Sequence, residues 1–313
     1  MTILSADSIR KASRLSGVWL REIRPLFLLG SVALAFLGAS IAWADGSFRL
    51  YDVALAFLGL LLWQLSVQVL NDYFDYRTGI DLKTQRTPFS GGSGVLPAQL
   101  LKPGTVLGVG VLSFVLALPI WVHFLLEKGM LLLPVLAVGA ACVLLYTPVL
   151  TRWKVPEVFS GIGLGALPVL AFYFVQTGGY AMGAVVAAVA SAVLMFNVHL
   201  LFELPDVEAD RAGGRKTLPA VLGTRKASWL YLASSTVYYV WVVSWTVLRI
   251  MPEAALLSLL TMPLAVLVTK GALDYRGPGS AAQVVWLGAA TYFLTVVLLA
   301  LGYMFSTFSL SVF

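Results

Sequence analysis

Nine long apolar runs constrain this 313-residue chain more than any other feature of its sequence. They cover residues 26–44, 52–70, 104–124, 130–150, 157–176, 181–203, 228–248, 253–270 and 282–306. Each run has about 20 residues, the length that an α-helix needs to cross the hydrocarbon core of a bilayer. Hydrophobic residues make up 59% of the chain and charged residues only 12%, which excludes a soluble domain of this size. The sequence therefore predicts an all-α polytopic membrane protein, a single domain over 1–313 with nine transmembrane helices in a bundle.

The distribution of basic residues orients such a bundle. With nine spans, all 21 Lys and Arg residues except Arg49, Lys128 and Arg249 fall on the same side as the N-terminus. Cytoplasmic loops of membrane proteins carry this excess of positive charge. We therefore expect a plasma (inner) membrane protein with its N-terminus in the cytoplasm. Its basic leader (1–25) and its long polar loops (71–103 and 204–227) would lie on that side. Because the basic residues are dispersed over membrane-flanking loops, the net charge of +6 does not indicate nucleic-acid binding.

Two short clusters hold seven of the 15 acidic residues. The first is Asn71-Asp72-Tyr73-Phe74-Asp75, followed by Asp81, and the second runs from Glu203 to Asp210. The first cluster directly follows the second apolar run, and the second cluster directly follows the sixth. The two halves of the chain therefore share the same order of features. Carboxylates are costly beside hydrocarbon, so repeated clusters at span ends indicate a functional site. We expect pseudo-repeated halves with the site between them and opening toward the cytoplasm.

The spacing within each cluster favours cation binding. Asp72 and Asp75 are three residues apart and Asp206 and Asp210 are four apart, so each pair shares one face of a helix. Mg²⁺ prefers a few carboxylates together with water and phosphate oxygens over a full protein cage. The two pairs are therefore candidate ligands for Mg²⁺ bound to a phosphate-bearing substrate.

Basic and aromatic residues near the clusters complete the expected site. Basic side chains can neutralise a diphosphate and stabilise it as it leaves. The candidates are Arg24, Lys83, Arg86, Arg152, Lys154, Arg211, Arg215 and Lys216. Among these we favour Lys83, Arg86 and Lys154, which lie closest to an acidic cluster or to a short cytoplasmic turn. The glycine-rich segment 86–96 predicts a lid over the site. Aromatic residues such as Tyr146 can stabilise a carbocation or, equally, form a membrane-interface belt.

These motifs resemble the UbiA superfamily of intramembrane prenyltransferases. The resemblance is carried by Asn71-Asp72-x-x-Asp75, by Asp206-x-x-x-Asp210, by Arg24-Pro25 entering the first span, by Leu145-Tyr146-Thr147 ending the fourth, and by Arg211-x-x-Gly214-Arg215-Lys216-Thr217-Leu218. Within the superfamily, the long gap from Asp75 to Asp81 and the run from Glu203 to Leu218 are similar to the MenA branch. That branch prenylates 1,4-dihydroxy-2-naphthoate in menaquinone biosynthesis.

The resemblance implies a mechanism and a set of roles. Two Mg²⁺ ions on a prenyl diphosphate would be held by Asn71, Asp72, Asp75, Asp206 and Asp210. Substrate binding would also involve Arg24, Asp81, Lys83, Arg86, Lys154, Glu203, Arg215 and Lys216. Tyr146 would assist an allylic carbocation, which an electron-rich aromatic acceptor attacks while the isoprenoid tail lies among the spans in contact with lipid.

Three other interpretations remain open at the level of sequence. The acceptor of a related enzyme can be 4-hydroxybenzoate, homogentisate, a chlorophyll precursor, haem or a glycerol lipid. A cation-coupled transporter would carry ionisable residues near the bilayer midplane, whereas the middles of these spans are almost free of charge. A structural or assembly protein leaves the paired acidic motifs unexplained. The sequence therefore favours Mg²⁺-dependent transfer of a polyprenyl group to an aromatic acceptor.

Overall fold

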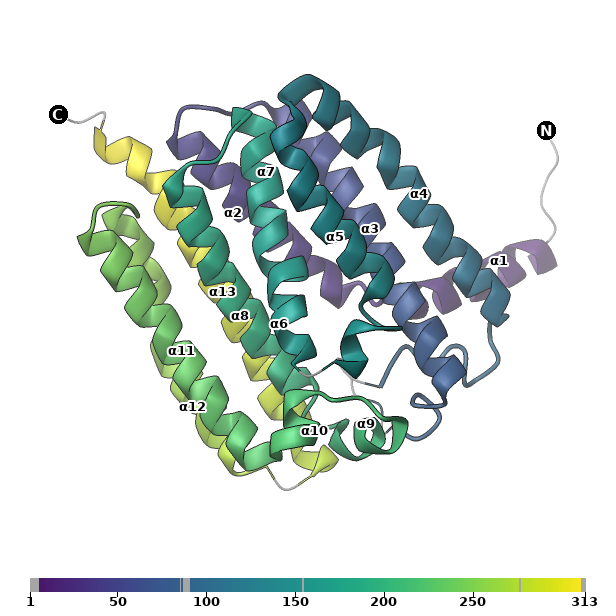
Figure 1. Ribbon diagram of the computed structural model, residues 1–313. Helices are drawn as coiled ribbons and strands as arrows, with labels where there is room; N and C mark the ends of the chain where they lie inside the picture. Colours follow the sequence, from purple (N-terminus) through teal and green to yellow (C-terminus); the bar gives the residue numbers. More distant parts are fainter. Residues whose placement is uncertain (1–5, 85, 87–90, 154, 276, 311–313) are drawn as a thin grey trace.

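A computed structural model describes residues 6–84, 86, 91–153, 155–275 and 277–310 of the chain. These residues form a bundle of long helices with no strand among them, and short helices gather at one end (Figure 1). The prediction of an all-α membrane protein is confirmed.

Seven helical segments of the described chain are long and apolar enough to cross a membrane. They are α2 (Leu26–Ala44), α3 (Leu50–Thr78), α4 (Pro103–Lys128), the continuous segment Pro156–Thr177, α8 (Met182–Phe202), the segment Glu253–Leu273 ending in α12 (Met262–Leu273), and Ala282–Ser306 within α13 (Pro278–Leu310). The segment Pro156–Thr177 is built from α6 (Pro156–Ser160), a π-helical turn (Gly161–Ala166) and α7 (Leu167–Thr177).

The other two predicted spans are also helical but differ from these seven. The predicted span 130–150 is the shorter apolar helix Met130–Leu145, most of which is α5 (Leu133–Leu145). The predicted span 228–248 lies in α11 (Thr224–Val247), which carries several hydroxyl side chains among its apolar residues. Two of these face neighbouring helices: Ser228 donates to the carbonyl of Ala272 at 2.8 Å, and Ser235 accepts from Asn197 at 3.0 Å. These two hydroxyls therefore serve packing within the bundle.

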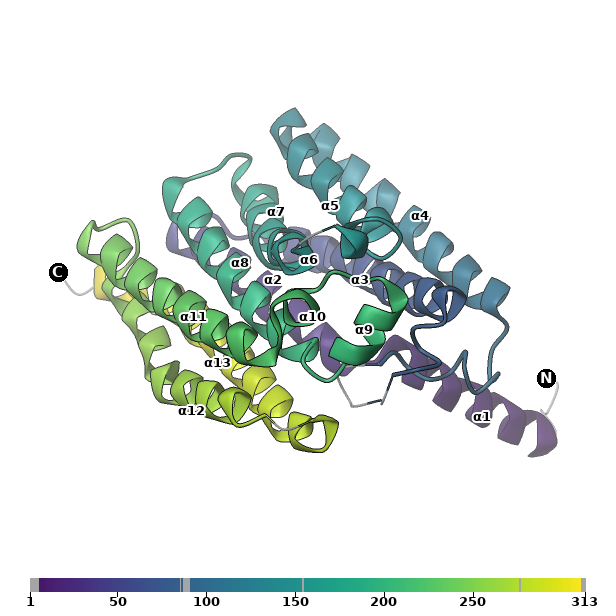
Figure 2. The same ribbon diagram turned by 60° about the horizontal axis from the view of Figure 1, so that its bottom comes forward.

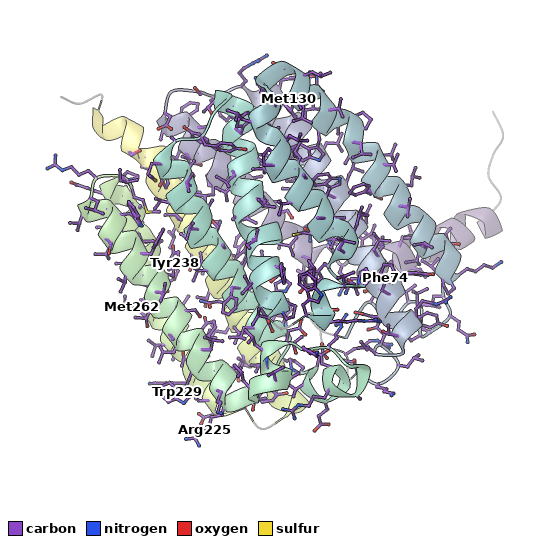
Figure 3. The ribbon with its side chains drawn as sticks, viewed as in Figure 1. Phe74, Met130, Arg225, Trp229, Tyr238 and Met262 are labelled. Atoms are coloured by element: carbon purple, nitrogen blue, oxygen red, sulfur yellow. The ribbon has the colours of Figure 1, made fainter. Side chains whose placement is uncertain are left out.

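Two buried apolar clusters form the interior of the bundle. One is centred on α2, α8, α11 and α13 and contains Leu37 and Tyr238, which are completely buried. The other joins α3, α4, α5 and α7 around Trp63, Phe124 and Phe172. Large apolar side chains on the outside, such as Met130, Trp229 and Met262, are 43–61% exposed, as expected of a surface that faces lipid (Figure 3).

The short elements lie together at one end of the bundle (Figure 2). They are α9 (Val207–Gly213) and α10 (Leu218–Leu222), near the segment that follows α3. The helix α1 (Ala6–Ile23) extends away from the bundle and joins α2 through Arg24, whose φ of 48° is unusual for a non-glycine residue. This sharp turn brings the start of α2 next to the end of α3.

Candidate active site

The first acidic cluster lies on a helix. α3 continues to Thr78, so Asn71, Asp72 and Asp75 are helical, and the loop expected from residue 71 begins only at Gly79. Gly79 has a φ of 76° and ends the helix in the left-handed conformation that glycine adopts without strain. The amide of Ile80 then donates to the carbonyl of Asp75 at 3.1 Å, which turns the chain back toward the site.

The second acidic cluster flanks and enters α9. Asp206 directly precedes the helix, and the amide of Asp210 donates to the Asp206 carbonyl at 2.8 Å. Pro205 separates this short helix from α8, which ends at Phe202. The expected loop 204–227 is thus mostly helical, because α9, α10 and the start of α11 lie within it.

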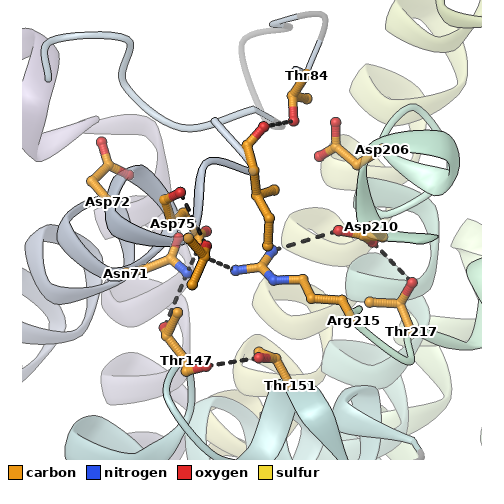
Figure 4. A network of polar contacts seen from close by, with 12 residues as sticks. Asn71, Asp72, Asp75, Thr84, Thr147, Thr151, Asp206, Asp210, Arg215 and Thr217 are labelled. Atoms are coloured by element: carbon orange, nitrogen blue, oxygen red, sulfur yellow. Dashed lines mark hydrogen bonds and ion pairs between the residues drawn. The ribbon is translucent and has the colours of Figure 1, made fainter. Parts of the chain in front are cut away.

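Arg215 joins the two clusters (Figure 4). Its guanidinium forms an ion pair with Asp75, and its Nη1 lies 3.7 Å from Oδ1 of Asp210. Oδ2 of Asp210 accepts a hydrogen bond of 2.9 Å from Oγ1 of Thr217. Burial lowers the pKa of Arg215, but the carboxylates of Asp75 and Asp210 outweigh it and raise the pKa above its ordinary value. Arg215 is therefore a permanent positive charge between the motifs.

Asp72 faces different partners from those of Asp75. One oxygen lies 3.1 Å from Nη2 of Arg24, and the other accepts a 2.8 Å hydrogen bond from the amide of Ser93. The hydroxyl of Ser93 donates to Glu22 at 2.6 Å. The end of α1 and the glycine-rich segment therefore meet on the first motif.

Asn71 connects the first motif to the end of α5. Its amide nitrogen donates to Oδ2 of Asp75 at 3.1 Å and to Oγ1 of Thr147 at 3.0 Å (Figure 4). Thr147 is adjacent to Tyr146, whose ring meets that of His199 edge-on with centroids 6.4 Å apart. The predicted aromatic residue Tyr146 is thus placed at the site.

The glycine-rich segment contacts both motifs. The amide of Gly91 donates to Oδ2 of Asp206 at 3.2 Å, while Ser93 donates to Asp72 as described. At Gly92, φ is +67° and a Cβ atom would lie 2.5 Å from Oδ2 of Asp81, so only glycine fits there. Residues 87–90 of the predicted lid lie outside the described residues. The described part links the acidic clusters across the site.

The predicted basic residues differ in where they lie. Arg24 and Arg215 face acidic side chains. Arg86 donates to the carbonyls of Gly91 and Asp81, both at 3.3 Å, and so folds onto its own segment. Lys83 and Lys216 are exposed, and Lys154 lies outside the described residues. The structure therefore brings two of the predicted basic side chains directly onto the acidic motifs.

A polar cavity of about 130 Å³ lies between the two motifs. Its lining includes the predicted residues Arg24, Asn71, Asp75, Asp81, Tyr146, Glu203, Asp206 and Arg215. It also includes Gln64 and Gln68 on α3, which we did not predict as site residues. They precede Asn71 by seven and three residues, so their helical spacing places them on the face that bears the motif.

Two apolar cavities border the polar one. The larger, of about 220 Å³, lies among α2, α8 and α13 and shares Phe27, His199 and Phe202 with the polar cavity. Its lining reaches Leu29 and Trp286, which are 49% and 45% exposed on the outside of the bundle. The smaller lies among α3, α5 and α7 and shares Tyr146 with the polar cavity. Polar and apolar cavities therefore adjoin one another at this end of the bundle.

The carboxylates of the site suit a hard divalent cation. Burial and neighbouring carboxylates raise the pKa of Asp81 to about 7 and that of Asp206 to about 8, so positive charge is needed to hold them ionised. One buried oxygen of each of Asp72, Asp81, Asp206 and Asp210 accepts no hydrogen bond within the described chain, and those of Asp72 and Asp210 face only the guanidinium groups of Arg24 and Arg215. The described His, Cys, Asp and Glu side chains do not form a group of three around one metal position. The guanidinium of Arg215 lies between Asp75 and Asp210. Such a site fits an ion whose remaining ligands come from a substrate.

The fold and the site together define a membrane-embedded enzyme with buried carboxylates at one end of a helical bundle. The chain belongs to the UbiA prenyltransferase family, whose family model matches residues 31–294, and it is thus a prenyltransferase.

Individual relatives agree with this assignment. A 1,4-dihydroxy-2-naphthoate octaprenyltransferase from Bacillus subtilis (strain 168) is 29% identical over 292 residues, covering 91% of each chain. Protoheme IX farnesyltransferase 1 from the same organism is 27% identical over 223 residues, covering 66% of this chain and 63% of the relative. A solved UbiA homologue from Archaeoglobus fulgidus, bound to GPP and Mg²⁺, has the same fold with a TM-score of 0.61. It is 14% identical, covering 90% of this chain and 99% of that homologue.

Proposed function

We propose that this enzyme transfers a polyprenyl group from an allylic prenyl diphosphate to an aromatic acceptor in an Mg²⁺-dependent reaction. The observation that carries the proposal is the convergence of Asp75 and Asp210 on Arg215 beside a polar cavity that adjoins an apolar one. A diphosphate needs the charged end of this space, and an isoprenoid chain needs the apolar part. The UbiA homologue described as bound to GPP and Mg²⁺ supports the same substrate class.

Asn71, Asp72, Asp75, Asp206 and Asp210 would hold two Mg²⁺ ions with the diphosphate. Bound there, Mg²⁺ would neutralise the negative charge that builds up on the leaving diphosphate. Arg215 and Arg24 add fixed positive charge on the two sides of the same space, and Asp81 and Glu203 line it. Lys83, Arg86, Lys154 and Lys216 remain proposed contributors to binding when substrate is present.

The residues behind the motifs then control the carbon chemistry. The bond between C1 of the prenyl group and the diphosphate oxygen breaks, and both electrons leave with the diphosphate. The faces of Tyr146 and other cavity aromatics stabilise the allylic cation and help exclude water from it. An electron-rich carbon of the acceptor ring bonds to C1, and the ring becomes aromatic again by losing a proton. The larger apolar cavity receives the tail and directs it toward lipid.

We propose 1,4-dihydroxy-2-naphthoate as the acceptor, as in menaquinone biosynthesis. The octaprenyltransferase relative that covers 91% of each chain supports it, together with the Asp75-to-Asp81 spacing. The farnesyltransferase relative keeps haem as the alternative acceptor. We further propose that the chain crosses the plasma membrane nine times, with its N-terminus and site facing the cytoplasm. The nine helical segments and the distribution of basic residues support this topology.

A product assay tests this function. Purified protein in lipid nanodiscs is incubated with a prenyl diphosphate, Mg²⁺ and each acceptor in turn, and products are identified by mass spectrometry. We expect a prenylated naphthoate-derived product that disappears in EDTA and in Asp206→Ala. If prenylated haem formed instead, haem and not the naphthoate would be the acceptor. The absence of product with every acceptor would refute the proposed function.

A further inference from the structure

Two glutamines on α3 line the site, and the amide of one of them has no hydrogen-bond partner in the described chain. Gln64 and Gln68 are 8% and 5% exposed, so both are more than nine-tenths buried. Both amide atoms of Gln68 are buried and unpaired, and the side chain of Gln64 lines the same cavity. Burying an amide without a partner is unfavourable, and native proteins rarely do so. The unpaired amide of Gln68, with Gln64 lining the same cavity, therefore indicates a ligand with polar groups.

Their positions on α3 say where that ligand lies. Gln64, Gln68, Asn71 and Asp75 follow one another by four, three and four residues, so they form one stripe along the helix. With a rise of about 1.5 Å per residue, Gln68 lies about 4.5 Å and Gln64 about 10.5 Å deeper than Asn71. The stripe therefore runs from the acidic motif, where the diphosphate is proposed to bind, into the bundle.

The cavities that each glutamine lines locate this ligand more closely. Of the three cavities, Gln68 lines only the polar one, whereas Gln64 lines the polar cavity and both apolar cavities. Gln64 thus stands at the junction where the charged end of a prenyl diphosphate, its tail and a third molecule would meet. In the proposed reaction this junction holds C1 of the prenyl group and the acceptor ring.

The chemistry of a primary amide identifies the group that it would bind. An amide offers one carbonyl acceptor and two N–H donors and carries no charge. An isoprenoid tail has no polar group to bind, and the diphosphate would be bound by Arg24, Arg215 and the cations that the acidic motifs are proposed to hold. A hydroxylated aromatic ring with a carboxyl substituent offers both a donor and acceptors for the two amides.

We propose that Gln64 and Gln68 form the acceptor subsite of this enzyme. Their amides bind the hydroxyl and carboxyl oxygens of the aromatic acceptor and orient its ring carbon toward C1 of the prenyl group. This inference rests on the proposed function, because it assigns one of the two substrates of that reaction to these residues. It makes the pair determinants of acceptor specificity, separate from the motifs that bind the diphosphate.

The test compares Gln64→Leu and Gln68→Leu with Ser66→Ala in nanodiscs. Ser66 is a matched control because it lies on the same helix, is completely buried and has an unpaired hydroxyl, yet lines none of the three cavities. We expect the acceptor KM to rise at least tenfold in each glutamine variant, with the KM for prenyl diphosphate changed less than twofold. Ser66→Ala should leave both constants unchanged. Isothermal titration with 1,4-dihydroxy-2-naphthoate alone should show the same tenfold loss of affinity.

Other results would refute the acceptor subsite, the proposed function or both. A rise in the KM for prenyl diphosphate alone would assign the amides to that substrate and refute the acceptor subsite. Glutamine variants that behave like Ser66→Ala would refute it as well. If the wild type binds the naphthoate but forms no product with any acceptor, the proposed function fails while the titrations still decide the role of the glutamines. If the wild type neither binds nor converts an aromatic acceptor, both proposals fall.

Discussion

The guanidinium of Arg215 pairs with the carboxylate of Asp75, 140 residues away in the chain. Arg215, in the second half of the protein, thus compensates the charge of Asp75, while Arg24 in the first half pairs with Asp72. Arg215 is only 12% exposed, and Asp75 is 7% exposed. A buried ion pair of this kind adds little net stability, but losing one partner leaves the other charge buried and uncompensated.

Arg215→Ala should therefore destabilise the protein strongly. The substitution leaves Asp75 and Asp210 facing each other across the site without a countercharge. We expect a loss of about 3–5 kcal/mol in the free energy of unfolding, together with loss of activity. Thermal unfolding in detergent measures the first effect and the product assay the second. Arg225→Ala, which removes an exposed arginine on α11, should do neither (Figure 3). Equal melting temperatures for the two variants would contradict the bridging role.

Asp206→Asn should separate metal binding from folding. The amide keeps the size of the side chain, and its carbonyl oxygen can still accept the hydrogen bond from Gly91. The negative charge is lost, so we expect kcat to fall about 100-fold or more at saturating substrate, with a higher Mg²⁺ requirement. The matched control is Glu208→Gln, two residues away and exposed, which should keep its Mg²⁺ dependence. An unchanged Mg²⁺ titration in Asp206→Asn would show that this carboxylate does not serve the cation.

Gly213→Ala tests how closely the two motif segments must pack. A Cβ atom at Gly213, the last residue of α9, would lie 2.3 Å from Cγ1 of Ile80, the buried residue that follows the C-cap of α3. Relief of this overlap must shift either the buried Ile80 side chain or α9, so we expect a cost of about 1–3 kcal/mol and a lower kcat/KM. Gly104→Ala on α4, where the added methyl meets open space, serves as the control. Wild-type turnover in Gly213→Ala would mean that the motif segments tolerate separation.

The acidic residues were predictable from sequence because the free-energy cost of placing a carboxylate beside hydrocarbon depends on its neighbours in the sequence. A carboxylate beside an apolar run needs a reason wherever the chain folds, and helical spacing alone pairs Asp206 with Asp210. The helix count was predictable only in part. Seven of the nine apolar runs lie in helices long and apolar enough to span, whereas Met130–Leu145 is short and α11 carries several hydroxyl side chains among its apolar residues.

The basic residues of the site were not predictable in the same way. Topology alone places nearly all of them on one side, so sequence could not rank Arg215 above Lys83. The selection depends on backbone turns: Arg24 adopts a φ of 48°, and Arg215 directly follows Gly214 with a φ of 77°. The hydrogen bond from Ser93 to Asp72 was not predictable for a related reason. The backbone at Ser93 is flanked by Gly92 and Gly94, which both have positive φ angles.

Glu22 should make stability depend on pH. It is completely buried at the end of α1, and burial followed by the charge of Asp72 raises its pKa to about 7, although Ser93 and Arg24 oppose the shift. The ordinary value is 4.5, so between pH 4.5 and 7 the folded protein binds a proton that the unfolded chain releases. The stability from this protonated form is complete below pH 4.5 and is lost as the pH rises through 7.

Glu22→Gln should remove this dependence, because the amide stays neutral and its oxygen can still accept the hydrogen bond from Ser93. We expect the variant and the wild type to melt together at pH 5 and the variant to be more stable at pH 8.5. The difference should be on the order of 3 kcal/mol at most, from the shift between the two pKa values. Thermal unfolding in detergent across this range measures it, with Glu253→Gln as an exposed glutamate control. If the wild type and Glu22→Gln keep the same difference in melting temperature from pH 5 to 8.5, Glu22 does not titrate in this range. In that case the contact between α1 and the first motif involves an ionised carboxylate throughout.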